Sequence, residues 1–469
     1  MTMFRRRTRL LALALPVAVL LSACGGEGGE GGEGDGSDRS LTVWTVEDVA
    51  DRVEAQKRIL ADFTKATGVP AKLVPVAEDQ LTSVLSSAAA ADDLPDVIGA
   101  LPLTAVNRLL TDDLLDTETA AAVVGDLGEG TFTEQALKLT RGKGAQLAVP
   151  SDGWAQLLFY RKDLFDKAGL AAPDTYDAIS KAARTLGRDG TTGIVAGTAP
   201  GDSFTQQSFE SLALANGCDL VGANGDVALD SPGCAEAFGF YSGLLRDHSV
   251  RGNQDADTTR ASYFSGRAAM TIWSSFLLDE LAGLRDDALP SCPECKDDKT
   301  FLAKNTGVVS ALRGPKGTAP VTFGEIVSWA VVKGAPSAEA RKFVGYMMGD
   351  GYEKWLAVSP EGKVPVRQGT EDDPRRYLTA WKDMKAGVDR KEPLSRFYGE
   401  DVLESVMKSP ESFARWGVSQ GQGELAGAAA GQFIVPRALA DLIGSGGDPA
   451  KAAGEAARKV RSLKEEIGS

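Results

Sequence analysis

Strand and helix patterns alternate along this chain, and that alternation constrains the fold more than any other feature. The segment "LTVWT", which begins at Leu41, predicts a strand, and "DVADRVEAQKRILADFTKATG" repeats apolar residues at helical spacing until Gly68 and Pro70 end it. The segments "AKLVPV", "EDQLTSVLSSAAAA" and "PDVIGA" then predict a strand, a helix and a buried strand. Two consecutive strand–helix–strand units favour a parallel sheet with right-handed crossovers. We therefore expect an α/β protein.

The same alternation continues through the middle of the chain. We expect strands at "AQLAVPS", "AQLLFYR", "TGIVAG", "AAMTIW" and "IVSWAVVKG", and helices at "DTYDAISKAARTL" and "GCAEAFGFYSGLLRDH". Asn224-Gly225 predicts a tight turn. The last hundred residues are expected to be mainly helical.

The N-terminus has the pattern of an export signal. Four arginines precede an apolar run of 12 residues, Leu10 to Leu21, which is too short to span the roughly 30 Å hydrocarbon core of a bilayer. Small residues and Cys24 follow, and this pattern resembles the lipobox of bacterial lipoproteins. The resemblance implies that residues 1–23 are a signal peptide and that Cys24 is lipidated. An ordinary signal peptide followed by a chance cysteine is the alternative.

Residues 24–40 are predicted to be a flexible linker. Half of the 16 residues from Gly25 to Ser40 are glycine and five are acidic, so the segment has no apolar surface to offset the entropy of ordering. A glycine-rich coil of this length spans about 22 Å on average.

Charge and length restrict the function of the remaining chain. Removing residues 1–23 takes away four positive charges, so the formal net charge changes from −14 to −18. An acidic chain without a basic stripe is a poor nucleic-acid binder. The remaining length and the 43% hydrophobic content suggest two domains, and no later segment is apolar for long enough to span a membrane.

The four remaining cysteines allow three pairings. We favour Cys218 with Cys234 and Cys292 with Cys295, because each pair encloses a short stretch and the two pairs lie far apart in the sequence. A zinc site or a thioredoxin-like redox motif at Cys292-Pro-Glu-Cys295 is the alternative, although the chain has a single histidine to complete a zinc site.

Several segments together resemble a known family. In order, they are "LTVWT", "ADFTKATGVPAKLVPV", "LPDVIGA", "LAVPSDGWAQLLFYRKDLFDKAGL", "YFSGRAAMTIW" and "SWAVVKGAPSAEARKFVGYMMGDGYEKWLAVSPEGKVPVR". Their order and spacing are similar to those of the extracellular solute-binding proteins of ABC importers, in the carbohydrate-binding, maltose-binding-protein-like group. The cysteine pairs and the "CPECKDD" loop depart from that pattern.

The resemblance implies a type II periplasmic-binding-protein fold with two hinged lobes around a ligand cleft. The N-lobe would comprise 41–150 and 324–370, and the C-lobe 151–323 and 371–469. Crossing segments are expected near 148–153, 318–330 and 370. Such lobes close over a ligand that contacts both of them.

The resemblance also implies a function. We expect a monomeric, membrane-tethered binding protein on the outer face of the bacterial cytoplasmic membrane that captures a sugar or oligosaccharide and delivers it to the membrane subunits of an ABC permease. No cofactor, no metal and no nucleic-acid partner are expected.

Candidate ligand contacts follow strand ends, where carboxylates and aromatic rings would meet sugar hydroxyls and C–H faces. In the first half of the chain they are Glu47, Asp48, Asp152 and Trp154. The first two would otherwise be acids that are favoured at a helix N-terminus, and Trp154 would otherwise pack in the core or the hinge.

The remaining candidates are expected in the second lobe or, for Trp329, in a crossing strand. They are Asp202, Ser203, Trp273, Ser275, Phe276 and Trp329. Asp202 and Ser203 would otherwise cap a helix, and Trp329 would otherwise pack in the hinge.

An exported enzyme is the rival hypothesis. His248 is the only histidine, and the sequence lacks the His-Glu-x-x-His, Gly-x-Ser-x-Gly and phosphate-loop motifs. A glycoside hydrolase that uses paired carboxylates stays open as an alternative, because acids are abundant. An adhesive or scaffolding surface protein is a third alternative.

Overall fold

The computed structural model describes residues 40–77 and 80–467. The signal peptide, Cys24 and nearly all of the predicted linker lie outside them. Within the described part, the predicted α/β alternation is confirmed at its start. The elements run β1 (Leu41–Thr45), α1 (Ala50–Thr67), β2 (Ala71–Pro75), α2 (Leu81–Ala90) and β3 (Val97–Pro102). Strand β1 pairs in parallel with both β2 and β3, as two successive strand–helix–strand units require.

The main sheet of the described residues has nine strands, and its central path is β10-β6-β9-β3-β1-β2. Strands β7 and β8 pair with β6, and β13 pairs with β9. The later strands are β6 (Val149–Arg161), β7 (Met270–Ser274), β8 (Thr306–Val309), β9 (Thr322–Val331), β10 (Val364–Pro365) and β13 (Phe413–Ala414). Short two-residue strands form two further pairs, β4 (Arg141–Gly142) with β5 (Ala145–Gln146) and β11 (Lys385–Ala386) with β12 (Glu392–Pro393).

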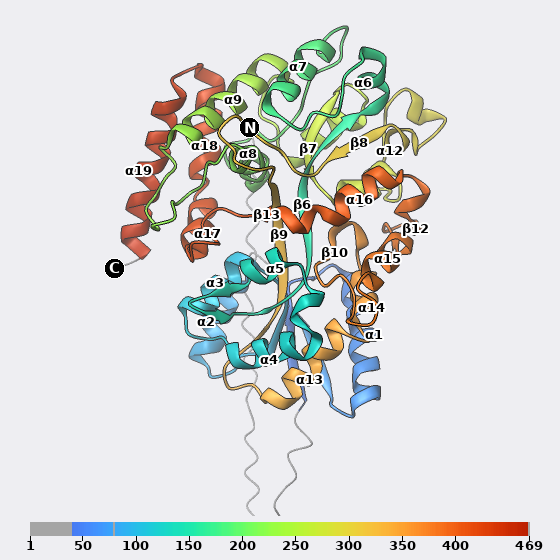
Figure 1. Cartoon of the computed structure of the whole chain (residues 1–469), viewed down its shortest axis with the longest axis vertical. Coiled ribbons are helices and arrows are strands. Elements are labelled where there is room, and N and C mark those ends of the chain that lie inside the picture. The colour runs from blue at the N-terminus through green and yellow to red at the C-terminus, as the bar shows by residue number, and fades with distance from the viewer. Residues whose placement is uncertain (1–39, 78–79, 468–469) are drawn as a thin grey trace, which may run out of the picture. The chain divides into compact units, whose positions relative to one another are not determined.

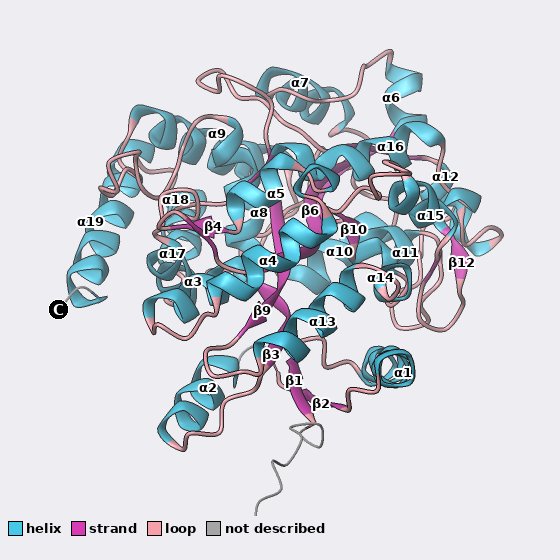
Figure 2. Cartoon of the chain, turned by 60° about the horizontal axis from the view of Figure 1, so that its bottom comes forward, coloured by secondary structure: helices cyan, strands magenta, loops and turns pink. Residues whose placement is uncertain are grey.

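Helices cover both faces of this sheet, and consecutive strand residues show which face each belongs to. Val43 packs in one core, with side chains of α1 and α13, whereas the adjacent Trp44 packs in another core, with side chains of α2. Figure 2 shows α1 and α2 on opposite sides of β1 and β3. The alternation of side chains along a strand therefore builds a three-layer arrangement.

The helices after β3 fall into three runs along the chain. The first run is α3 (Leu103–Thr111), α4 (Thr117–Leu127) and α5 (Glu134–Leu139). The second is α6 (Lys162–Ala168), α7 (Tyr176–Leu186), α8 (Ser203–Ala215), α9 (Pro232–His248), α10 (Ala256–Phe264), α11 (Leu277–Leu281) and α12 (Phe301–Lys304). The third is α13 (Ser337–Met348), α14 (Tyr352–Leu356), α15 (Arg376–Asp383), α16 (Glu400–Lys408), α17 (Gly423–Gly431), α18 (Ile434–Ser445) and α19 (Pro449–Ile467). In Figure 1, α3 and α4 lie around one end of β6, and α7, α9 and α18 lie around the other.

The prediction of two separate strands around Asp152-Gly153 is wrong, because β6 is one continuous strand of 13 residues. Its first half pairs with β9 and β10, and its second half pairs with β7 and β8. The Asp-Gly pair, which normally favours a break, is accommodated by a register shift between Pro150 and Asp152. Strand β6 thus passes from one set of partners to another (Figure 1).

The segment "TGIVAG" also differs from its prediction, since it forms isolated bridges from Thr192 to Ala268 and from Val195 to Thr271 rather than a strand. The Ile194 amide donates to the carbonyl of His248, the last residue of α9, and the Val195 amide donates to that of Met270 in β7. Isolated bridges and single backbone hydrogen bonds thus replace the predicted strand.

Both favoured cysteine pairings are confirmed as disulfides, Cys218–Cys234 and Cys292–Cys295. All four cysteines are buried. Within 40–77 and 80–467, no helix is long and apolar enough to cross a membrane.

Candidate functional site

Two adjoining cavities lie beside the crossing strands β6 and β9. The first, here called the Lys363 chamber, has a volume of about 340 Å³, and the second, the Arg415 chamber, has a volume of about 310 Å³. Four residues line both: Ala100, Trp154, Gln207 and Val327. The two chambers therefore form one cleft that Trp154 divides.

Backbone pairing explains how distant segments meet in the Lys363 chamber. Glu47 follows the end of β1, and Asp152 lies in β6. Strand β10 pairs antiparallel with β6, with Val364 opposite Gly153, so Lys363 comes to the same place. Helix α1 adds Arg52, and the turn after β7 adds Phe276.

Lys363 is the centre of a buried charge cluster. Its Nζ lies 2.8 Å from Glu47 Oε2, 3.5 Å from Asp152 Oδ1 and 4.1 Å from the centre of the Trp355 ring. Its side chain is 3% exposed. Burial opposes the charged form, but the attraction of Asp152 and Glu47 outweighs it and raises the pKa of Lys363. The ammonium is therefore held charged inside the protein.

Glu47 is held ionised by two cations. Arg52 Nη1 donates a hydrogen bond of 2.6 Å to Glu47 Oε1, and Lys363 binds the other oxygen. Burial by itself would raise the pKa of Glu47, but the charges of Lys363 and Arg52 lower it from 4.5 to about 2. The carboxylate is therefore a fixed acceptor at the edge of the chamber.

Asp152 is fully buried, and burial raises its pKa despite the nearby ammonium of Lys363. Its Oδ2 accepts hydrogen bonds from Ser151 Oγ at 2.6 Å and from Trp355 Nε1 at 2.7 Å. Its Oδ1 has no hydrogen-bond partner among the described residues. One carboxylate oxygen is thus fixed by the protein, and the other has unused hydrogen-bonding capacity.

Aromatic rings complete the Lys363 chamber. The rings of Trp154 and Phe276 have centroids 6.5 Å apart, and both side chains line the chamber. The Arg52 guanidinium lies 5.6 Å from the Phe276 ring centre. Phe276 approaches Gly362 so closely that a Cβ there would lie 1.9 Å from the ring. Glycine at position 362 therefore leaves the space that the Phe276 ring occupies.

The Arg415 chamber contains a second buried charge cluster. Arg415 Nε donates to Glu210 Oε1 at 3.2 Å, and Arg415 Nη1 pairs with Glu325. The other Glu325 oxygen accepts from the Leu103 amide at 2.8 Å, at the first residue of α3. Burial raises the pKa of Glu210, against the charge of Arg415. Arg415 thus connects α8, β9 and, through Glu325, the start of α3.

Four of the ten sequence-predicted contacts line these chambers, and the other six do not. Glu47, Asp152, Trp154 and Phe276 line the Lys363 chamber. Asp48 is exposed and lines neither chamber. Asp202 accepts a hydrogen bond of 2.9 Å from the Phe204 amide as the N-cap of α8, and Ser203 is exposed at the first position of that helix.

The other three predicted contacts are buried away from the cleft. Trp273 packs against Phe204, with ring centroids 4.6 Å apart. Trp329 is fully buried between Phe343 and Trp355. Ser275 is buried, and its amide donates to the carbonyl of Ala155. These positions favour a packing role for Trp273 and Trp329 rather than ligand contact. For Trp329, packing was the alternative given in the sequence analysis.

Sequence reasoning missed most of the polar lining. The missed residues are Arg52, Thr104, Gln206, Gln207, Glu210, Ser274, Glu325, Lys363 and Arg415. One local signal was present, since Gln206 and Gln207 follow the N-cap Asp202 within the first turns of α8. Lys363 and Arg415 had no such signal, because each meets its partners only through sheet pairing or helix packing.

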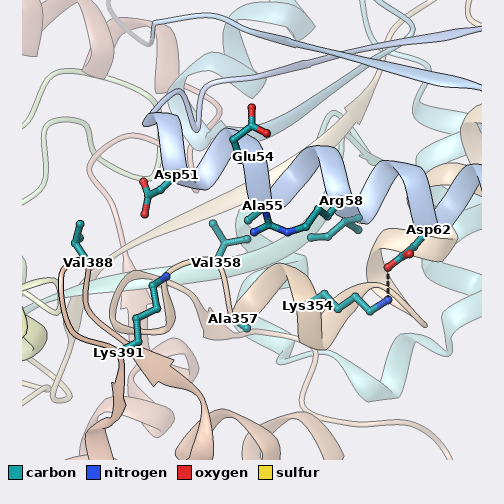
Figure 3. Close-up of a pocket in the computed structure, with 11 residues that line it drawn as sticks. Asp51, Glu54, Ala55, Arg58, Asp62, Lys354, Ala357, Val358, Val388 and Lys391 are labelled. Atoms are coloured by element: carbon teal, nitrogen blue, oxygen red, sulfur yellow. Dashed lines mark hydrogen bonds and ion pairs between the residues drawn. The ribbon is translucent and has the colours of Figure 1, made fainter.

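The groove of about 640 Å³ shown in Figure 3 has a greater volume than either chamber but a different character. It lies along α1, where Asp51, Glu54, Arg58 and Asp62 follow one another at helical spacing, and Lys354 pairs with Asp62 at 2.6 Å. None of the ten predicted contacts lines it. Among residues 40–77 and 80–467, no group of three His, Cys, Asp or Glu side chains is placed to hold a metal ion.

Comparison with known proteins gives a consistent family. The family described as bacterial extracellular solute-binding protein matches residues 58–386, which is more than half of the chain. A putative ABC transporter periplasmic-binding protein, YcjN of Escherichia coli K12, is 27% identical over 342 residues, covering 71% of this chain and 73% of that protein.

Solved structures show the same fold at low sequence identity. The cyclic alpha-maltosyl-1,6-maltose binding protein of Arthrobacter globiformis is 18% identical, with a TM-score of 0.69 over 91% of this chain and 98% of the other. A solute-binding protein of Agrobacterium radiobacter K84, solved with ribitol, is 18% identical, with a TM-score of 0.65 over 91% of this chain and 99% of the other. The type II periplasmic-binding-protein fold expected from the sequence is thus confirmed.

Proposed function

The chain belongs to the family of bacterial extracellular solute-binding proteins, and from that premise we propose that it is the sugar-binding component of an ABC transporter, with its ligand in the cleft of the Lys363 and Arg415 chambers. One observation carries the proposal: carboxylates held in place by buried cations stand beside the rings of Trp154 and Phe276. Such rings suit the C–H faces of a sugar, and the carboxylates suit its hydroxyls.

Similar proteins support the ligand class. The structural neighbours include proteins described as bound to ribitol, maltose and laminaribiose, and the curated relative is described as part of an ABC transporter. We therefore assign a sugar or oligosaccharide as ligand and the membrane subunits of an ABC permease as partner.

Binding is proposed to couple to hinge closure. We assign 41–150 and 324–370 to the N-lobe and the remainder of the folded part to the C-lobe. This division is supported by β6, which pairs with β9 and β10 in its first half and with β7 and β8 in its second. A ligand in contact with Glu47 and Phe276 would touch both assigned lobes, so it would favour the closed state.

We further propose that Cys24 carries a lipid and that residues 24–40 tether a monomer to the outer face of the cytoplasmic membrane. The lipobox-like sequence and the glycine-acid composition support this assignment. Mass spectrometry of the mature N-terminus should show an acylated Cys24, and Cys24→Ser should release the protein from membranes. An unmodified mature N-terminus would contradict the anchor.

Sugar binding is testable with the folded part of the chain. In thermal-shift and calorimetric titrations with mono- and oligosaccharides, a few related sugars should raise the unfolding temperature, because they bind only the native state. Chromatography of the same mixtures should show the sugars intact. Cleavage of a bound sugar would contradict the binding function in favour of a glycoside hydrolase.

The aromatic contacts can be tested against a matched control. Trp154→Ala and Phe276→Ala should each weaken binding of the sugar by about tenfold or more, since aromatic contacts contribute about 1 kcal/mol beyond the area they bury. Phe240→Ala removes a partly buried ring that stacks on Tyr176 and lines neither chamber, so affinity should stay unchanged. Equal affinity in all three variants would show that the ligand lies elsewhere.

A further inference from the structure

We propose that the cleft selects an uncharged saccharide of at least two units, with one unit in each chamber, and that the Arg415 chamber supplies the contacts of the second unit. This inference rests on the proposed function and goes further, because it states a minimum length for the ligand and that the ligand carries no charge. Three features of the cleft carry it: volume, unused hydrogen-bonding groups and charge.

Volume sets the number of units. A hexose has about a dozen non-hydrogen atoms, and a chamber of 340 or 310 Å³ lies at the lower end of the roughly 300–1,000 Å³ range of small-molecule pockets. Each chamber thus accommodates one hexose unit. Trp154 and Gln207 line both chambers, so a glycosidic link between the two units would pass beside them.

An unused polar group indicates that the Arg415 chamber is more than a packing gap. Gln206 lines it and is 8% exposed, and its Oε1 has no hydrogen-bond partner among the described residues. Arg415, whose side chain is 15% exposed, uses Nε for Glu210 and Nη1 for Glu325. A buried polar group without a partner is costly, and ligand hydroxyls would supply one as both donors and acceptors.

Small residues of α17 also form part of the wall of this chamber. Ala426, Gly427 and Ala430 line the chamber. Helix α17 also packs against α3, where Gly423 is so close to Asn107 that a Cβ would lie 2.7 Å from the amide carbon. The small side chains therefore leave room for a ligand while the helix covers it.

Charge restricts the second unit to a neutral sugar. The chamber contains two carboxylates, Glu210 and Glu325, and one guanidinium, Arg415, which is paired with both. A uronic acid unit would bring a third carboxylate to a site whose single cation is already engaged. In a partly buried site, repulsion between the carboxylate of the ligand and those of Glu210 and Glu325 disfavours binding of that ligand.

The test compares sugars of different length on two leucine variants of α17. Calorimetry would use glucose and galactose, their common disaccharides including maltose, cellobiose and laminaribiose, the matching trisaccharides, and the aldobiouronic acid that corresponds to the best disaccharide. The wild-type protein should bind one disaccharide at least tenfold more tightly than its monosaccharide, and the aldobiouronic acid at least tenfold more weakly than the disaccharide.

Ala430→Leu should fill the second chamber and remove the advantage of the disaccharide while leaving monosaccharide affinity unchanged. Gly431→Leu is the control, because Gly431 is exposed and has no neighbour within 4 Å of a built Cβ. Gln206→Leu, which keeps the size of the side chain, provides a second variant with the same expected loss in case Ala430→Leu fails to fold.

The possible failures are distinguishable. Equal affinity for the monosaccharide and the disaccharide, or equal losses for both in Ala430→Leu and Gln206→Leu, would overturn the two-unit inference and leave the proposed function intact. Tighter binding of the aldobiouronic acid would overturn the charge assignment. Absence of binding by every sugar in the series would contradict the proposed function itself.

Discussion

At the scale of single residues, the cleft is built around two cations that each lie between two carboxylates. Lys363 lies between Glu47 and Asp152, and Arg415 lies between Glu210 and Glu325. Removing one member of a buried pair costs more than the pair contributes, because the remaining charge loses its partner. These residues therefore fix the shape of the cleft before any ligand binds.

Glu47→Gln should make stability less dependent on acid pH. The folded-state pKa of Glu47 is about 2 against an ordinary value of 4.5, so its contribution is fully present above pH 4.5 and is lost as the pH falls toward 2. Between pH 6 and pH 3, the difference in unfolding free energy between the wild type and this variant should shrink by about 2 kcal/mol. Urea unfolding at both pH values measures it.

Glu54→Gln is the control for this experiment. Glu54 lies on the exposed surface of α1, where its ion pair with Lys57 is solvated and contributes little. If Glu47→Gln and Glu54→Gln show the same pH dependence, Glu47 is not held ionised by Lys363 and Arg52.

At the scale of elements, the two disulfides stabilise different amounts of chain. Cys218 and Cys234 are 16 residues apart and connect the end of α8 to the first turn of α9. Cys292 and Cys295 are three residues apart, within the loop that precedes α12. A longer closed loop restricts the unfolded chain more strongly.

Replacing both members of each pair by alanine should separate the two effects. Loss of the Cys218–Cys234 bond should lower the unfolding free energy by about 3 kcal/mol, and loss of the Cys292–Cys295 bond by about 2 kcal/mol, from the loop-entropy estimate. Urea unfolding of the two double variants under oxidising conditions measures the difference, and the wild type under reducing conditions should approach the sum. A larger loss for the shorter loop would contradict this order.

At the scale of the whole described fold, β6 and β9 carry the chain between the two assigned lobes. A glycine in each strand leaves room for the ring of Phe413 in β13, which packs against both strands. A Cβ on Gly153 would lie 2.7 Å from the Phe413 ring and 2.8 Å from the carbonyl oxygen of Glu325. A Cβ on Gly324 would lie 2.1 Å from the same ring. The crossing therefore depends on glycine at both positions.

Gly153→Ala should force β6 and β9 apart and lower the unfolding free energy by about 1–3 kcal/mol, as overpacking does in a dense core. Gly125→Ala, in α4 with open space around its Cβ position, should be neutral or stabilising. Chemical unfolding of the two variants compares them directly. Equal stability would show that the crossing can relax around an added methyl group.

Local patterns in the sequence were enough for most of the elements and for the α/β class. The alternation from Leu41 to Pro102 predicted β1, α1, β2, α2 and β3, because apolar spacing follows the period of each element. The cysteine spacing favoured the pairing that the structure shows. Where a local signal failed, as at Asp152-Gly153, neighbouring strands supplied hydrogen bonds that the local sequence does not reveal.

The sequence by itself predicted most of the alternation of strands and helices, the disulfide candidates and the acids Glu47 and Asp152 as candidate contacts, since these predictions use only neighbours in the chain; Asp152 lies within β6 rather than at a strand end. Only the tertiary structure decided that Lys363 stands between those acids and that Arg415 joins Glu210 to Glu325. It also separated Trp154, which lines the cleft, from the buried Trp329. The physical reason is that charge pairing and burial depend on distances in space, which residues far apart in the chain acquire only when the sheet and helices have packed.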